Sequence, residues 1–142
     1  MLDWSPSVQA FVQAHRVARL ATVDGSGRPL VLPICYVLTE ETLYSPTDAK
    51  PKRVPVQRLK RLRNIQANPH VALVIDDYGE DWTQLAYVIM HGIAEILTGG
   101  PDFERAVAAL REKYPQYHRM PIQENPMIAV HLTRVVHWGA VG

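Results

Sequence analysis

The strongest constraint on the fold is a succession of short runs rich in β-branched and aromatic residues, separated by turn residues. The first two runs flank DGSGRP at 24–29, whose two glycines allow a tight reversal, and together they predict a β-hairpin. A polar reversal, TEET at 39–42, precedes a third strand, which Pro46 stops. Gly92 falls within the longest run and predicts a bulge or bend there. The six predicted strands are 17–23, 30–38, 43–45, 71–76, 85–97 and 128–138.

Three further segments have the spacing of amphipathic helices. Ser5 followed by Pro6 is typical of a helix start, and apolar residues recur at helical spacing after it. A second helix is predicted from about residue 55 to 68, and a third from 102 to 114. Six strands in hairpins with a few helices predict an antiparallel α+β protein, and a closed barrel is favoured because it leaves no exposed strand edge. The 142 residues fit a single domain.

The basic residues are concentrated in one place. Lys50–Arg63 holds seven of the fifteen Lys and Arg residues and no Asp or Glu, so the rest of the chain is net negative. Such a cluster in a nearly neutral protein predicts an anionic ligand, most commonly a phosphate. Because neither G-x-G-x-x-G nor G-x-x-x-x-G-K-[ST] occurs, the phosphate site is expected to be built from side chains. The alternative interpretation is that the same cluster forms a solvated helix face or a patch that binds nucleic acid.

Other features narrow the class of protein. No apolar run approaches the roughly 20 residues of a membrane helix, and the N-terminal sequence lacks the basic region of a secretory signal, so we expect a cytoplasmic protein. Cys35, the only cysteine, lies in an apolar strand and is interpreted as a small core residue. His131 and His137 are separated by about 20 Å of strand, which is too far for one ion, and no metal site is predicted.

Two stretches, ARLATVDGSGRPLVLPICYVLTEETLYS and RNIQANPHVALVID, with the basic segment between them, resemble the flavin-binding split-barrel superfamily of the pyridoxamine phosphate oxidases and deazaflavin-dependent oxidoreductases. The continuation DDYGEDWTQLAYVIMHGIAEIL, with KPKR upstream, resembles a subgroup that uses coenzyme F-420. The resemblance implies a six-stranded antiparallel split β-barrel with a few peripheral helices. It also implies a homodimer that binds its cofactor at the subunit interface.

The resemblance further implies where the cofactor lies. The flavin or deazaflavin ring is expected against the second and third strands, and the phosphate against the basic segment. Two aromatic residues are expected to contact the cofactor from the neighbouring subunit. The ring residues are Leu32, Pro33, Ile34, Tyr44 and Ser45, the phosphate residues are Thr47, Lys50, Lys52, Arg58 and Arg61, and the two aromatics are Tyr87 and Trp138. Hydride chemistry belongs to the ring, so no catalytic acid or base is assigned.

The expected activity is hydride transfer between coenzyme F-420 and a small organic substrate. The surplus of cations favours the deazaflavin, whose tail adds carboxylates, over FMN, which offers a single dianion. Vitamin B6 oxidation is rejected because the chain stops at Gly142 without the Arg-and-His tail of those oxidases. The alternatives are an FMN-dependent oxidoreductase of the same fold and a non-catalytic protein that binds a tetrapyrrole or nucleic acid.

Overall fold

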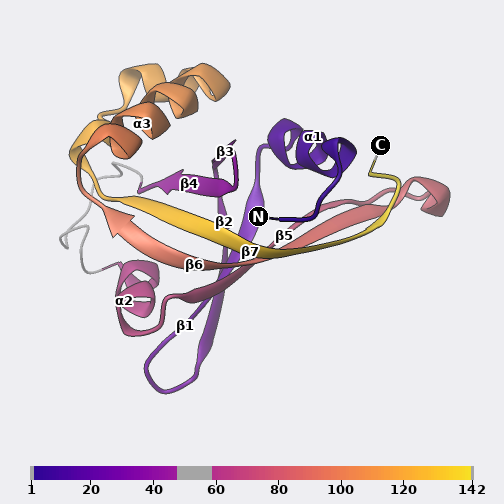
Figure 1. Cartoon of the computed structure of the whole chain (residues 1–142), viewed down its shortest axis with the longest axis horizontal. Coiled ribbons are helices and arrows are strands. Elements are labelled where there is room, and N and C mark those ends of the chain that lie inside the picture. Colours follow the sequence, from indigo (N-terminus) through magenta and orange to yellow (C-terminus); the bar gives the residue numbers. More distant parts are fainter. Residues whose placement is uncertain (1, 48–58, 142) are drawn as a thin grey trace.

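The computed structural model describes residues 2–47 and 59–141 and shows an α+β protein built on one curled antiparallel sheet (Figure 1). The described strands follow the order β2-β1-β5-β6-β7-β4-β3. They are β1 (Ala18–Val23), β2 (Pro29–Ile34), β3 (Val37–Thr39), β4 (Thr42–Pro46), β5 (His70–Asp77), β6 (Ala86–Leu97) and β7 (Met127–Gly139). The helices are α1 (Pro6–Ala14), α2 (Lys60–Ala67) and α3 (Pro101–Lys113), with 3₁₀ turns at Trp82–Gln84, Pro115–Arg119 and Ile122–Glu124. The predicted class and the antiparallel pairing are confirmed.

The predicted number of six strands is wrong, because the run at 30–38 forms two strands. The chain leaves the sheet at Cys35 and Tyr36, so that β2 and β3 become the two opposite ends of the sheet. The sheet is therefore curled but open between these ends, where a closed barrel was expected. The run gave no sign of this break, because apolar residues continue through it.

The break is stabilised by a residue far away in the sequence. The Tyr114 hydroxyl accepts a hydrogen bond from the Tyr36 backbone N–H at 3.1 Å. It also lies 2.9 Å from the Tyr36 carbonyl oxygen and 2.7 Å from that of Arg16, to which it can donate. The Tyr36 side chain is fully buried and donates its own hydroxyl proton to the Val12 carbonyl. Backbone groups that would otherwise be buried without partners are thus satisfied outside the strand ladder.

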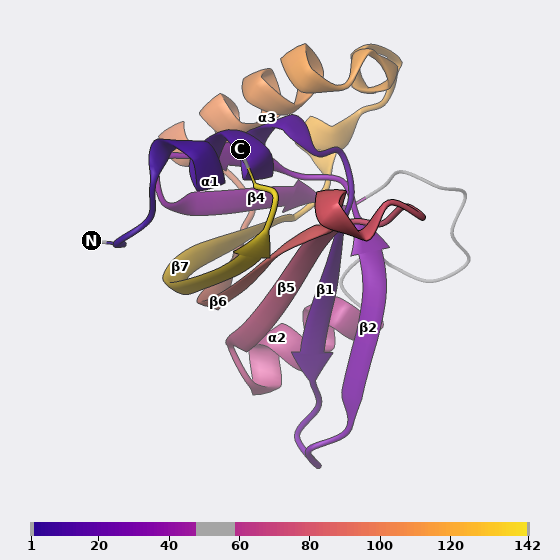
Figure 2. The same ribbon diagram turned by 90° about the vertical axis from the view of Figure 1, so that its right-hand side faces the viewer.

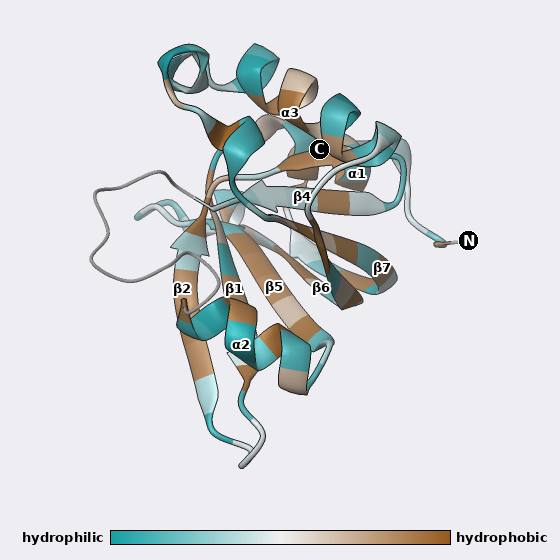
Figure 3. Ribbon diagram, turned by 90° about the vertical axis from the view of Figure 1, so that its left-hand side faces the viewer, coloured by the Kyte–Doolittle hydropathy of each residue, from teal (hydrophilic) through white to brown (hydrophobic). Residues whose placement is uncertain are grey.

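Two apolar clusters pack against the sheet. The larger fills its concave side and includes Leu20, Leu73 and Val88, with α1 and α2 contributing Val12 and Leu62. The smaller lies beneath α3. Figure 2 shows β7, β6, β5, β1 and β2 in succession, with β4 crossing beneath α1 and α3. Figure 3 shows apolar residues along β1 and β5, and polar and apolar residues together on α2.

Two local predictions from the sequence, the start of the first helix and the bulge at Gly92, are confirmed. The Ser5 hydroxyl accepts the Val8 N–H at 3.2 Å and begins α1 at Pro6. The pairing of β6 with β7 shifts register between His91 and Gly92, as the bulge prediction required. A Cβ at Gly92 would stand 2.6 Å from Val130 Cγ1, so this position accepts no larger residue without movement.

Of the second predicted helix, 60–67 is helical and residues 55–58 lie outside the described part. No helix in the described part of the chain is long and apolar enough to cross a membrane.

Candidate functional site

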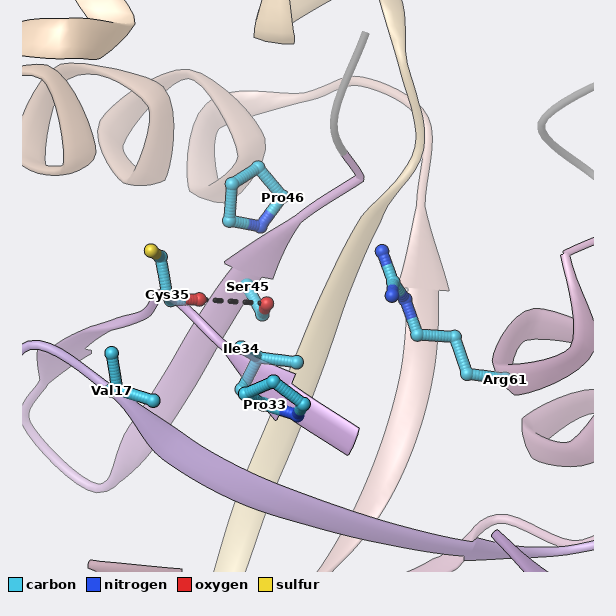
Figure 4. Close-up of a pocket in the computed structure, with 7 residues that line it drawn as sticks. All are labelled: Val17, Pro33, Ile34, Cys35, Ser45, Pro46 and Arg61. Carbon is cyan, nitrogen blue, oxygen red and sulfur yellow. Dashed lines mark hydrogen bonds between the residues drawn. The ribbon is translucent and has the colours of Figure 1, made fainter. Parts of the chain in front are cut away.

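A cavity of about 220 Å³ opens where the ends of β2 and β4 face α2 (Figure 4). Four of the residues predicted to bind the cofactor line it together: Pro33 and Ile34 from β2, Ser45 from β4 and Arg61 from α2. The other lining residues are Val17, Cys35 and Pro46. The cavity thus joins an apolar wall, one hydroxyl and one guanidinium. We call it the first cavity.

The break between β2 and β3 brings the first cavity's two strands together. The Ser45 hydroxyl donates to the Cys35 carbonyl at 2.8 Å, which ties the end of β4 to the end of β2 (Figure 4). With its proton used in this way, the Ser45 oxygen can still accept a hydrogen bond from a ligand. Cys35, interpreted from the sequence as a core residue, is instead partly exposed and forms part of the wall.

Helix α2 carries Arg61 to the opposite side of the first cavity. Leu62 and Ile65 bury the apolar face of the helix against the core. The buried Asn64 side chain donates to the Thr22 hydroxyl at 2.9 Å, which fixes α2 on β1. In Figure 4 the Arg61 side chain extends from α2 toward the space beside Pro46. The helix therefore holds this cation at the edge of the apolar wall.

The neighbouring cation on α2 points elsewhere. Lys60 Nζ lies 3.5 Å from Asp24 Oδ2, in the turn between β1 and β2. Hydrogen bonds from the Arg28 and Ser26 backbone N–H groups, with the Lys60 charge, hold the pKa of Asp24 below its usual range. Asp24 therefore stays ionised and keeps Lys60 at the turn, so Lys60 provides a comparison for Arg61 on the same helix.

Three predicted ring or phosphate residues do not line the first cavity. Leu32 packs against the larger apolar cluster. Tyr44 is buried in the cluster beneath α3, because its side chain points to the opposite face of β4 from Ser45, and burial raises its pKa. The Thr47 hydroxyl is fully buried and donates to the Pro126 carbonyl at 2.8 Å. In this structure neither Tyr44 nor Thr47 lines the first cavity, and contact of either with a cofactor stays a prediction.

The two predicted aromatics lie together on the convex side of the sheet. Tyr87 and Trp138 are cross-strand partners on β6 and β7, and their rings stack with centroids 5.7 Å apart. Trp138 is 52% exposed, and neither residue lines the first cavity of its own chain. Contact with a cofactor of a neighbouring subunit stays a prediction for both.

The remaining predicted phosphate residues, Lys50, Lys52 and Arg58, lie outside the described residues. Conversely, sequence reasoning missed Val17 and Pro46 as lining residues. Pro46 directly follows Ser45 at the end of a strand, so adjacency could have found it. Val17 precedes β1, and its place at the cavity depends on the curl of the sheet, for which the sequence has no local signal.

Residues 5–139 match the protein family described as pyridoxamine 5'-phosphate oxidase. A 5a,11a-dehydrotetracycline/5a,11a-dehydrooxytetracycline reductase from Streptomyces rimosus is 29% identical over 134 residues, which cover 93% of this chain and 80% of the reductase. A heme storage protein from Vibrio cholerae has a TM-score of 0.71 at 16% identity, over 95% of this chain and 93% of its own. An FAD-binding protein from Mesorhizobium loti has a TM-score of 0.68 at 21% identity, over 94% of each chain. The two structures share the fold, and the match over 5–139 decides the family: this chain belongs to the pyridoxamine 5'-phosphate oxidase family.

Proposed function

We propose that this protein is an oxidoreductase that holds a phosphorylated flavin-type cofactor, coenzyme F-420, and catalyses hydride transfer to a small organic substrate. The observation that carries the proposal is the first cavity, where the apolar wall of Pro33 and Ile34 stands opposite Arg61. Family membership and the likeness to a reductase support an oxidoreductase. The cofactor would supply the hydride chemistry, and the protein would bind, orient and shield it.

The residues of the first cavity fit the two ends of such a cofactor. Val17, Pro33 and Ile34 offer apolar surface to a flat ring and exclude water from it. Ser45 offers an acceptor oxygen, and Arg61 offers a planar set of N–H donors suited to phosphate oxygens. Thr47, Lys50, Lys52 and Arg58 remain proposed contributors to the phosphate site.

The choice of coenzyme F-420 over FMN rests on charge. Lys60 pairs with Asp24, and the other six cations within Lys50–Arg63 still exceed what one phosphate needs, since each charge-assisted hydrogen bond contributes about 1.5–3 kcal/mol. The carboxylates of the F-420 tail would use the surplus. FMN is the second candidate, supported by the FAD-binding protein of the same fold.

Co-elution distinguishes the candidate cofactors. The protein is incubated separately with F-420, FMN and heme, then passed through a desalting column, and the absorption spectrum of the protein fraction is recorded. We expect the deazaflavin spectrum to accompany the protein. A flavin spectrum alone would select the second candidate. A heme spectrum alone would contradict the redox role and select the tetrapyrrole alternative, which the heme storage protein of the same fold represents.

The convex face of the sheet is the proposed homodimer interface. A shallow apolar depression of about 330 Å³ spans β1, β2, β5 and β6 and is lined by Arg19, Ala21, Val31, Ala72, Leu73, Val74 and Ile89. Val31 is 61% exposed there, and Val136 and Trp138 on the same sheet are exposed as well. A contiguous apolar surface of this kind is typical of an interaction site. Pairing through it would explain the exposed Tyr87–Trp138 stack.

Replacing Val31 with lysine is expected to convert the dimer to a monomer, because a buried, unpaired ammonium would be placed in the apolar interface. Sedimentation velocity measures the change, with 16.0 kDa as the monomer mass. Gln66→Lys adds the same charge to an exposed position on α2 and is expected to leave the dimer intact. A wild-type protein that sediments as a monomer, or a Val31→Lys dimer as stable as wild type, would contradict this interface.

A further inference from the structure

A second cavity, of about 330 Å³, shares the lining residue Cys35 with the first. It is bounded by the segment before β1, the break between β2 and β3, and the 3₁₀ turn after α3. Its lining residues are Arg16, Cys35, Tyr114, Pro115, Gln116, Tyr117 and Met120. Tyr114 and Tyr117 meet edge to face with ring centroids 5.4 Å apart, so much of the wall is aromatic. The volume falls at the small end of the range for sites that bind small molecules.

The charge around the second cavity is positive. The Arg16 guanidinium lies 5.4 Å from the centre of the Tyr114 ring and donates one N–H to the Lys113 carbonyl at 2.6 Å. Lys113 Nζ lies 4.0 Å from the centre of the Tyr36 ring and 5.5 Å from that of Tyr114, one wall of the cavity. Among residues 2–47 and 59–141, neither cation forms an ion pair with a carboxylate.

The surroundings of Lys113 destabilise the charged form of its side chain. Its Nζ is buried and has no hydrogen-bond partner within the described residues, so aromatic faces alone stabilise its charge. Burial, and after it the Arg16 charge, lower the pKa of Lys113 to about 8. The other titratable groups around it are Cys35 and Tyr36 at the break and Tyr114 at the end of α3. Burial raises the pKa of both tyrosines above their ordinary value of 10.0, so neither offers Lys113 a negative charge at neutral pH.

We propose that the second cavity binds a small aromatic molecule with one negative charge. The aromatic and apolar wall would contact the ring, while Arg16 would face the anion directly and Lys113 would stabilise it from behind Tyr114. A cation is disfavoured by the same two charges, and a neutral ring would leave them uncompensated. This site goes beyond the proposed redox function, and binding to it requires no cofactor.

The proposal is tested by calorimetric titration of the cofactor-free protein with 2-naphthoate and with 2-naphthamide, its neutral counterpart. We expect naphthoate to bind more tightly. Arg16→Gln should weaken naphthoate about tenfold, the effect of losing roughly one charge-assisted contact. Lys113→Met should weaken naphthoate by a smaller factor, because Lys113 acts from behind Tyr114, and both variants should leave naphthamide unchanged. Arg119→Gln removes an exposed cation from the same 3₁₀ turn outside the cavity and should alter neither ligand. Equal affinity for the two ligands, or equal losses for both in the variants, would overturn the proposal.

Two measurements on the wild-type protein test the second cavity without depending on whether a variant folds. Naphthoate affinity should fall as pH rises through about 8, since Lys113 loses its proton there, while naphthamide affinity stays flat. Naphthoate should also slow alkylation of Cys35, the only cysteine, which lines this cavity. A flat naphthoate profile or unprotected Cys35 refutes the site. Failure here leaves the proposal for the first cavity untouched, because no flavin-type cofactor is present in the assay.

Discussion

Replacing Arg61 with methionine is expected to weaken the binding of coenzyme F-420 about ten- to hundredfold. The substitution keeps most of the aliphatic stem that leaves α2 but removes the guanidinium at the edge of the first cavity. Loss of one charge-assisted hydrogen bond to a phosphate costs about 1.5–3 kcal/mol, which corresponds to that change in affinity. Fluorescence titration of the deazaflavin measures it.

One control variant and one control ligand test whether the lost affinity comes from a contact between Arg61 and the phosphate. Lys60→Met makes the same charge change one residue away, but Lys60 faces Asp24, so affinity should change little. The deazaflavin without its phosphate should lose much less affinity than F-420 on the Arg61 substitution. If both forms weaken equally, or if Lys60→Met has the same effect, Arg61 does not bind the phosphate.

Replacing Tyr114 with phenylalanine is expected to lower the free energy of unfolding by about 2–3 kcal/mol. The change removes the hydroxyl that accepts the Tyr36 N–H and donates its one proton to the Arg16 or the Tyr36 carbonyl at the break between β2 and β3. A buried backbone group left without a partner costs about 1–3 kcal/mol, and a second lost contact adds to that. Urea denaturation measures the loss. Tyr78→Phe, at a residue 68% exposed, should be neutral, and an equally neutral Tyr114→Phe would contradict this account of the break.

The same hydroxyl gives stability a defined dependence on alkaline pH. Burial raises the pKa of Tyr114 to about 12, above its ordinary value of 10.0. Below pH 10 the folded and unfolded states both hold the proton. From pH 10 to about 12 only the folded state keeps it, so unfolding becomes more favourable as pH rises. Tyr36, whose pKa burial also raises, acts in the same direction. We therefore expect a shallower alkaline decline in Tyr114→Phe than in wild type, and an identical decline would contradict the shift.

Local signals explain how much of the fold could be predicted from the sequence. The β1–β2 turn was predictable because Asp24 accepts the Ser26 and Arg28 N–H groups and Gly27 takes a φ of +83°, all within five residues. The break at Cys35 and Tyr36 was not, because its stabilising hydroxyl is 78 residues away. A continuous apolar run fits one long strand equally well until that contact is known.

The candidate site, like the fold, could be predicted from the sequence only in part. The resemblance brought forward Pro33, Ile34, Ser45 and Arg61, and these meet at the first cavity. Alternation along a strand could have separated Tyr44 from Ser45 in advance, since neighbouring side chains point to opposite faces. The second cavity had no sequence signal, because Arg16, Cys35 and Tyr114 come from three segments that only the tertiary fold brings together.

A crystal structure of the protein with coenzyme F-420 tests the central claim most directly. We expect the deazaflavin ring against Pro33 and Ile34 and a phosphate oxygen within hydrogen-bond distance of the Arg61 guanidinium. Cofactor density in another cavity, or a phosphate held away from Arg61, would contradict the account.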